Sequence, residues 1–336
     1  MRNWICCTAA ALFLTAGCAS DVENGKMTEH GKLFLAMADL EAGGVARIDD
    51  ELNMHDMLPL PGVNYLILHD GTVYGAIDDG RSVGVAAIRD GKVLKIERGE
   101  GKISCHLAVS PAGNYLYLAN YGDGSIDEFR LIGGLPAFVR NIKLGEGARA
   151  HFVGFDPAGR LTAVDLGSDA VWFFDFDEES GCGAVAGRVD FPENAGPRHM
   201  VWLDGDTFAV ACELNSTLVI VRNRKIVQTL ATTFSGVENY PGALRLSPDG
   251  RWLVVTNRGE NSLGVFSRGG GGEWRLTSTV PCGGVWPRDC YFHNGKIYVA
   301  NDRSHNIAEF EFADGAATLL KSAAVRRLPM SFLTLE

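Results

Sequence analysis

The chain has 336 residues, of which 46% are apolar and 41 are glycine, and its formal net charge at pH 7 is −10. The acidic balance argues against nucleic acid as a partner, because phosphate binding needs clustered lysine and arginine. The body of the chain has no run of 18 apolar residues, so no transmembrane span is predicted.

The first 26 residues are expected to be a leader. Arg2 precedes an apolar stretch from Trp4 to Leu14 and the sequence LTAGC, which ends at Cys18 and resembles a bacterial lipoprotein signal. The alternative is that translation starts at Met27. The protein is then expected in the cytoplasm, whereas a lipidated Cys18 would make it a membrane-anchored lipoprotein.

Residues 27–336 are expected to form one domain, because one unit recurs along them. The unit is an apolar run, a turn such as Asp156-Pro157-Ala158-Gly159, and a second apolar run. Its copies run over Tyr65–Asp79, His106–Tyr121, His151–Leu166, His199–Leu214, Ala243–Arg258 and Asp289–Asp302, with a half-copy at Lys32–Leu40. The residues that close the second run, at spacings of 39 to 48 by subtraction, are Asp39, Asp78, Asn120, Asp165, Glu213, Asn257 and Asn301.

Seven such units, rich in alternating apolar residues, predict an all-β fold: a seven-bladed β-propeller with four-stranded antiparallel blades. A third strand such as 170–176 follows each closing residue, and an outer strand such as 225–230 completes the blade. One blade is expected to take its inner strand from Met330–Leu335 and its next strands from Leu33–Ile48. The N- and C-terminal strands then share a blade, and the ring closes without an open sheet edge.

The reversal of the chain at each turn predicts where the chemistry lies. The residue that opens strand one and the residue that closes strand two share a face of the disk, and strand one is innermost. Openers should therefore line the mouth of the central channel. They are Cys105-His106, Ala150-His151, Arg198-His199, Gly242-Ala243 and Arg288-Asp289.

Two arginines and three histidines thus gather at one mouth of an acidic protein, and Arg149 and Arg258 lie close enough in the pattern to join them. Local positive charge favours a small anionic ligand, and arginine suits carboxylate or phosphate groups. Some of these residues also have a purely structural interpretation. His106 is typical of a structural hydrogen-bonding group, and Asp165 of a cap on the following turn.

The cysteines after Cys18 have no metal-ligand spacing, and the chain has no P-loop, dinucleotide fingerprint or H-E-x-x-H motif. We therefore expect no metal and no cofactor. Hydrolysis or isomerisation is compatible with this, with histidine as the base and arginine as the electrostatic stabiliser.

The segments that carry these residues resemble the seven-bladed β-propeller lactonase family over about Lys32 to Glu336. They include HLAVSPAGNYLYLANYGDGSI, AHFVGFDPAGRL, GPRHM, ALRLSPDGRWLVVTNRGENSL and WPRD. This family includes the bacterial 6-phosphogluconolactonases and is related to carboxymuconate cycloisomerase. The most specific part of the resemblance is the ordered set His151, Pro197-Arg198-His199, Glu213-Leu214, Asn257-Arg258-Gly259 and Pro287-Arg288-Asp289.

The resemblance implies a catalytic set of His151, Glu213, Arg198 and Arg288. The residues expected to contact the substrate are His106, His199, Arg258, Arg149 and Asp165. Arg149 stands where the family has the first histidine of an H-x-H motif, and Cys212 stands where it has asparagine.

The implied activity is hydrolysis of a small anionic sugar lactone by a monomeric hydrolase, namely 6-phosphogluconolactone to 6-phosphogluconate in the pentose phosphate pathway. Arg198 and Arg288 would hold the anionic group or the developing oxyanion. His151 would take a proton from water, and Glu213 would orient that water or the histidine. Two alternatives stay open: a cycloisomerase that acts on a carboxylated substrate such as carboxymuconate, and a non-catalytic binding module.

Overall fold

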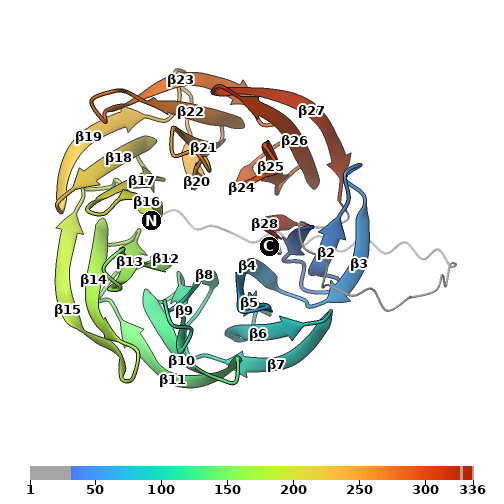
Figure 1. The fold of residues 1–336 in the computed structure, drawn as a ribbon, viewed down its shortest axis with the longest axis vertical. Helices are drawn as coiled ribbons and strands as arrows, with labels where there is room; N and C mark the ends of the chain where they lie inside the picture. The colour runs from blue at the N-terminus through green and yellow to red at the C-terminus, as the bar shows by residue number, and fades with distance from the viewer. Residues whose placement is uncertain (1–31, 326–327, 335–336) are drawn as a thin grey trace, which may run out of the picture.

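The computed structural model describes residues 32–325 and 328–334. Within this part of the chain all regular structure is β-strand, arranged as seven antiparallel sheets of four strands each. The sheets stand side by side around a central axis, as Figure 1 shows. The predicted seven-bladed propeller is therefore confirmed. The predicted leader, residues 1–26, lies outside the described residues.

Each blade runs from an inner strand at the channel to an outer strand at the rim of the disk. Blade I is β28 (Pro329–Thr334), β1 (Leu33–Met37), β2 (Gly44–Ile48) and β3 (Met54–Pro59). Blade II is β4 (Val63–His69), β5 (Thr72–Asp78), β6 (Val83–Arg89) and β7 (Lys92–Arg98). Blade III is β8 (Ser104–Val109), β9 (Tyr115–Asn120), β10 (Ser125–Ile132) and β11 (Leu135–Lys143).

The remaining four blades follow in chain order. Blade IV is β12 (Ala150–Phe155), β13 (Leu161–Asp165), β14 (Ala170–Asp177) and β15 (Gly181–Asp190). Blade V is β16 (Pro197–Asp204), β17 (Thr207–Cys212), β18 (Thr217–Arg222) and β19 (Lys225–Ala231). Blade VI is β20 (Tyr240–Leu246), β21 (Trp252–Arg258), β22 (Ser262–Arg268) and β23 (Trp274–Pro281), and blade VII is β24 (Pro287–His293), β25 (Lys296–Asn301), β26 (Asn306–Ala313) and β27 (Ala316–Ala324).

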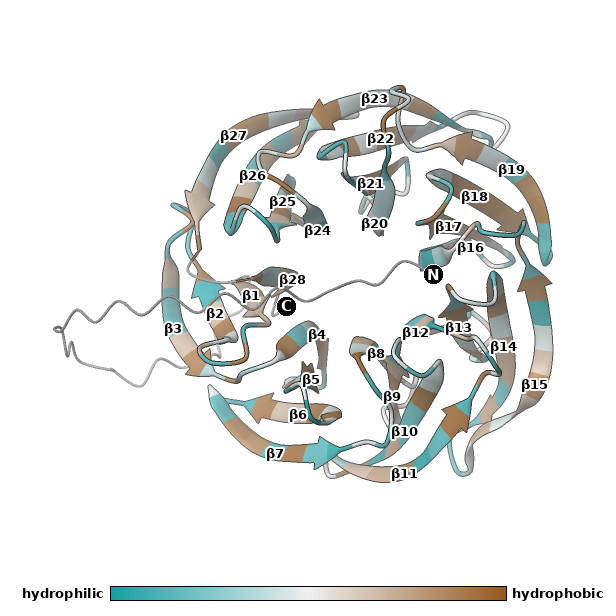
Figure 2. Ribbon diagram, turned by 180° about the vertical axis from the view of Figure 1, so that it is seen from behind, coloured by the Kyte–Doolittle hydropathy of each residue, from teal (hydrophilic) through white to brown (hydrophobic). Residues whose placement is uncertain are grey.

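Blade I is assembled from both ends of the chain, as the split repeat predicted. β28 pairs antiparallel with β1, with Leu35 opposite Phe332 and Phe34 opposite Leu333. Figure 2 shows β28 on the inside of β1, next to the inner strands β4 and β24 of the two neighbouring blades. The pairing leaves neither strand with a free edge at the seam, because each finds its hydrogen-bonding partner in the other.

The core lies between the blades rather than within one sheet. Each of the seven interfaces between neighbouring blades holds one cluster of buried apolar residues within the described part of the chain. Middle strands such as β5 and β9 are covered on both sides and read as continuous buried runs. Outer strands such as β7 alternate exposed and half-buried residues, and Figure 2 shows the matching alternation of hydropathy along the outer strands.

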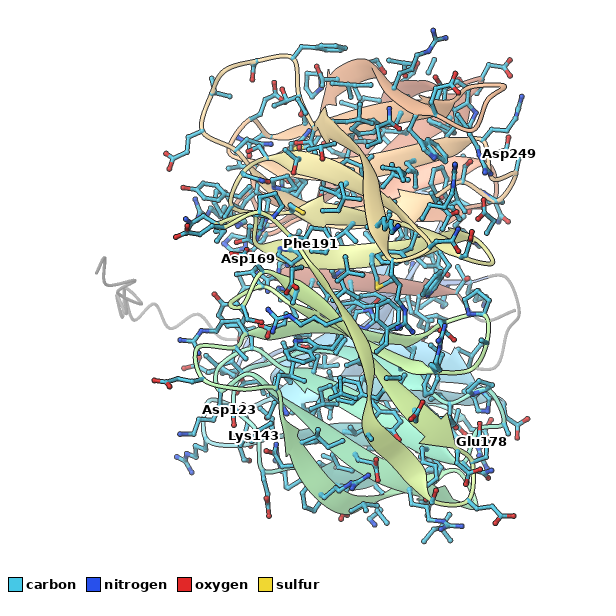
Figure 3. The ribbon with its side chains drawn as sticks, turned by 90° about the vertical axis from the view of Figure 1, so that its left-hand side faces the viewer. Asp123, Lys143, Asp169, Glu178, Phe191 and Asp249 are labelled. Atoms are coloured by element: carbon cyan, nitrogen blue, oxygen red, sulfur yellow. The ribbon has the colours of Figure 1, made fainter. Side chains whose placement is uncertain are left out.

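The turns divide between the two faces of the disk as the strand-reversal argument requires. Asp123 and Asp169 belong to turns between the second and third strands of a blade, and Asp249 to a turn between the first and second. Figure 3, an edge-on view, places Asp123 and Asp169 toward one face and Asp249 toward the other. The ends of the second strands and the beginnings of the inner strands therefore share the face of Asp123 and Asp169.

Ring closure should depend on the apolar side chains of β28. Phe332 is 3% exposed and its ring lies 6.3 Å from that of Tyr298 in blade VII. Phe332→Ala is expected to lower the free energy of unfolding by about 3–5 kcal/mol, measured by urea denaturation, because it opens a cavity at the seam.

The matched control is Leu320→Ala on β27, where the side chain is 48% exposed. This change is expected to alter stability by no more than about 0.5 kcal/mol. A loss of under about 1 kcal/mol for the Phe332 variant would contradict a structural role for the closing strand.

Candidate functional site

A small pocket occupies the mouth of the central channel, at the beginnings of the inner strands. Each lining residue opens an inner strand or lies next to an opener, because these strands start on one face and converge on the axis. The lining residues are Asn64, Tyr65, Ser104, Cys105, His151, Arg198, His199, Arg288, Asp289 and Met330. The structure thus brings together His151, Arg198, His199 and Arg288 from three blades, as the sequence predicted.

Glu213 follows β17 directly and contacts two arginines with a single oxygen. Its Oε2 lies 2.9 Å from Nε of Arg198 and accepts a hydrogen bond from Nη2 of Arg258 at 2.6 Å. Burial opposes ionisation of Glu213, but Arg258 and Arg198 outweigh it and hold the pKa of the carboxyl below its ordinary value. Glu213 is therefore an anchored carboxylate, and its other oxygen accepts no hydrogen bond from a described residue.

The two arginines on Glu213 differ in how much of each is available to a ligand. Arg258 donates from Nε to the carbonyl of Tyr240 and from Nη2 to the carbonyl of Pro241, each at 3.0 Å. Arg198 donates from Nη1 to the carbonyl of Gly242 at 2.8 Å, and its Nε is close to Glu213 without the alignment of a hydrogen bond. Burial and the nearby Arg258 lower the pKa of Arg198 to about 9. The geometry thus makes Arg258 a support for Glu213, while Arg198 also lines the pocket.

Arg288 is half-buried in the pocket and has no hydrogen bond or ion pair with any described residue. Together with Arg198 and Arg258 it brings three positive charges to the mouth of the channel, against the single negative charge of Glu213. A second pair nearby, Arg245 with Asp289, is balanced within itself. The site therefore has an excess of two positive charges in a protein with a net charge of −10.

Three histidine rings lie in series beside these arginines. The ring of His199 is 5.6 Å from that of His106 and 5.9 Å from that of His151. Burial, reinforced by Arg198 for His151 and His199 and by Arg245 for His106, lowers the pKa of each imidazole well below its ordinary value. All three rings are therefore neutral at physiological pH, and His151 is in the form that accepts a proton.

The structure places the other sequence-predicted residues outside the lining of the pocket. His106 is packed between the rings of Tyr65 and Phe152, at 4.2 and 4.1 Å. Asp165 is fully buried and accepts backbone hydrogen bonds from Arg149, Gly167 and Ser168, which is the turn-capping arrangement considered as its alternative.

Arg149 lies at the rim, next to the pocket rather than in it. Its Nη1 donates to the carbonyls of Gly122 and Ala148, and its guanidinium is 5.8 Å from the ring of Tyr121. Tyr121 in turn contacts the ring of His151 at 5.8 Å. The residue that departs from the family histidine therefore lies beside the pocket and is not among the residues that line it.

Several lining residues were missed in the sequence. Asn64 and Tyr65 lie near the start of β4, Ser104 opens β8, and Met330 lies in the closing strand. The rule about openers, applied to the copy that starts at Tyr65 and to the strand that starts at Met330, identifies two of these positions.

One sequence pattern is misleading. Residues Gly80–Gly84 spell G-x-S-x-G, which in α/β-hydrolases positions a nucleophilic serine on a strand-to-helix turn. Here Ser82 lies in a turn that leads into strand β6, and its hydroxyl is 3.4 Å from Oδ1 of Asp79. Ser82 is not among the residues that line the pocket.

Arg245 and Asp289 form a buried ion pair that joins three blades. Arg245 Nη2 lies 2.7 Å from Oδ1 of Asp289, and Oδ2 of Asp289 accepts the backbone N–H of Phe332 at 3.2 Å. The pair therefore ties β24 to β20 on one side and to the closing strand β28 on the other. Asp289 follows Arg288 directly and lines the pocket.

The described residues hold no cluster suited to a metal ion. No group of three or more His, Cys, Asp or Glu side chains among them is arranged to bind one. Over the same residues, no helix has the length and hydropathy needed to cross a bilayer.

The chain belongs to the lactonase family of seven-bladed β-propellers. The sequence profile described as "Lactonase, 7-bladed beta-propeller" matches residues 53–331. Over 250 residues the chain is 29% identical to the 6-phosphogluconolactonase of Bacillus subtilis (strain 168), covering 66% of this chain and 70% of that protein.

Solved structures give the same fold. A Lactobacillus plantarum protein has a TM-score of 0.84 at 22% identity and covers 92% of this chain and 100% of its own. The periplasmic gluconolactonase of Pseudomonas aeruginosa has a TM-score of 0.80 at 23% identity and covers 91% and 99%. At these identities the likeness supports the fold alone.

The buried ion pair gives a second test of stability. Asp289→Ala is expected to lower the free energy of unfolding by about 3 kcal/mol, because it leaves Arg245, whose side chain is only 19% exposed, without a counter-charge. Urea denaturation measures the effect. The control is Asp190→Ala, which removes a carboxylate that is 71% exposed and paired with Arg188; it should cost no more than about 1 kcal/mol. Equal losses in the two variants would contradict the argument from burial.

Proposed function

We propose that the protein is a lactone hydrolase that acts on a phosphorylated sugar lactone, namely 6-phosphogluconolactone, and releases 6-phosphogluconate without a metal ion. Membership of the lactonase family and similarity to the Bacillus subtilis 6-phosphogluconolactonase support lactone hydrolysis. The reaction is a step of the pentose phosphate pathway.

The observation that carries the choice of a phosphorylated substrate is the charge of the site. Arg198, Arg258 and Arg288 face one ionised carboxylate, Glu213, and the imidazoles beside them are neutral. An excess of two positive charges in a partly desolvated pocket is matched by a phosphate monoester, which carries about −1.5 to −2 at pH 7. A neutral lactone would leave these charges without a partner, which is costly where solvent is excluded.

Each of the four predicted catalytic residues has a separate role in the proposed reaction. Arg288, which has no partner among the described residues, binds the phosphate. Arg198 stabilises the negative charge that develops on the carbonyl oxygen when water attacks. His151, which is neutral, takes the proton from that water and returns it to the ring oxygen as the ring C–O bond breaks. Glu213 holds Arg198 in place.

The deciding assay compares three substrates with the full-length protein. Hydrolysis of freshly prepared 6-phosphogluconolactone above its spontaneous rate, with weaker activity on neutral δ-gluconolactone, is the expected result. Conversion of carboxymuconate, followed by its ultraviolet absorbance, would instead favour a cycloisomerase. Folded protein without activity on any of the three would favour a binding module.

The role of Arg288 has its own test. Arg288→Ala is expected to lower kcat/KM for 6-phosphogluconolactone by about 100-fold, equivalent to about 2–3 kcal/mol, mainly through KM. Activity on δ-gluconolactone should change little, because that substrate has no charge for Arg288 to bind.

The control for net charge is Arg251→Ala. Arg251 is 64% exposed and pairs with Asp249 on the opposite face of the disk. This variant should retain the activity of the wild type on both substrates. An equal loss on both lactones for the Arg288 variant would show that Arg288 does not recognise the phosphate.

The pH dependence follows from the neutral state of His151. Its pKa is lowered well below 6.5 by burial and by the nearby arginines Arg198 and Arg288. As the pH falls, the base remains neutral until the pH approaches this lowered pKa, and only then is activity lost. We expect kcat at saturating substrate to be constant from about pH 8 to below 6.5. A decline centred at or above pH 6.5 would contradict the assignment of His151 as the base.

The leader also stands as a proposal, with residues 27–336 as the propeller domain. Mass spectrometry of the native protein would distinguish a chain lipidated at Cys18 from one that starts at Met27.

A further inference from the structure

The pocket itself is too small for a sugar and has the size of a water site. The volume that the centre of a water molecule can reach inside it is about 20 Å³. One bound water needs roughly 10–15 Å³ by this measure, together with two to four polar partners. The lactone must therefore lie over this pocket, on its solvent side.

Three residues that line the pocket each have a buried polar atom that lacks a hydrogen-bond partner in the protein: Nδ1 of His151, Nδ1 of His199 and Oδ1 of Asn64. The orientation of Asn64 is fixed, because its Nδ2 donates to the carbonyl of Ser104 at 2.8 Å and leaves Oδ1 as the acceptor. A buried polar atom without a partner costs about 1–3 kcal/mol. Three of them around one pocket indicate that a ligand with both donors and acceptors belongs there.

The two imidazoles are close enough for one water molecule to contact both. Their ring centroids are 5.9 Å apart at an interplanar angle of 67°, which is an edge-to-face contact, and no hydrogen bond joins the rings. Both residues line the pocket, so one water in it can bridge a nitrogen of each ring. Both rings are neutral, so each offers one N–H donor and one acceptor nitrogen.

We propose that His199 and Asn64 hold the attacking water against His151, so that His199 is a second histidine of the reaction. This inference rests on the proposed lactone hydrolysis. The water donates one hydrogen to His151 and the other to Oδ1 of Asn64, and it accepts an N–H from His199. Its remaining lone pair points out of the pocket toward the carbonyl carbon of the lactone.

The chemical step balances without any further reactant. The water oxygen forms a bond to the carbonyl carbon while its proton passes to His151. The tetrahedral intermediate then collapses, the ring C–O bond breaks, and the proton on His151 goes to the departing ring oxygen. The product is the open-chain carboxylic acid, which ionises in solution. His199 remains neutral throughout and fixes the position of the water.

Glu213 is a weaker candidate for this role. Its Oε2 is occupied by Arg198 and Arg258, and it does not line the pocket. His199, by contrast, lines the pocket, is 5% exposed and has an unpartnered Nδ1.

Two substitutions of His199 separate a role in the reaction from a role in packing. His199→Phe keeps the ring contacts with His106 and Phe152 but removes the N–H. His199→Asn loses those ring contacts and keeps an N–H donor. If His199 holds the water, we expect kcat on 6-phosphogluconolactone to fall by about 100-fold in the Phe variant and by less than about 10-fold in the Asn variant, with KM within about twofold in both.

The control is His69→Gln, at the far end of the inner strand β4, which should have wild-type kcat. A Phe variant as active as the Asn variant would show that only packing matters and would overturn the proposal. A rise in KM at unchanged kcat would do the same, because the ring would then bind the substrate. Wild-type protein without lactonase activity would instead overturn the proposed function and this inference with it.

Discussion

The structure depends on the closing of the ring by the pairing of β28 with β1. A single blade has two apolar faces and can bury them only against two neighbours, so an open ring would expose a full interface on each side of the gap. The pocket also requires a closed ring, because its walls come from inner strands of several blades. Asp289 links ring closure to the pocket, since its carboxylate binds Arg245 of blade VI and the backbone of Phe332 in the closing strand.

The fold could be predicted from the sequence because a propeller repeats one local pattern. Each unit places continuous apolar runs in the middle strands and an alternating pattern in the outer one, and both correspond directly to burial. The half-copy at Lys32–Leu40 and the lone strand at Pro329 were sufficient to predict the shared blade, because together they make one complete unit. The bounds of individual strands differ from expectation by one or two residues.

The site could be predicted only in part. The strand-reversal argument assigns each opener to a face, and this brought His151, Arg198 and Arg288 together correctly. The strand-reversal argument does not predict which groups the charged end of a long side chain contacts. Arg258 is a predicted substrate contact, and this stays a prediction; its Nε and Nη2 donate to backbone carbonyls and to Glu213. Such contacts depend on which groups neighbouring blades present to one another, and no local pattern encodes them.

The electrostatics of the pocket make its parts interdependent. The arginines hold Glu213 ionised and, with burial, keep His151 and His199 neutral, so the same charges that attract an anion preserve a free base beside it. In water a histidine next to arginines would gain little from this arrangement, because solvent screens the charges. Here burial reduces screening and makes the coupling strong. In the proposed reaction the base must stay unprotonated near a phosphate dianion, and His151 lies where positive charge already opposes its protonation.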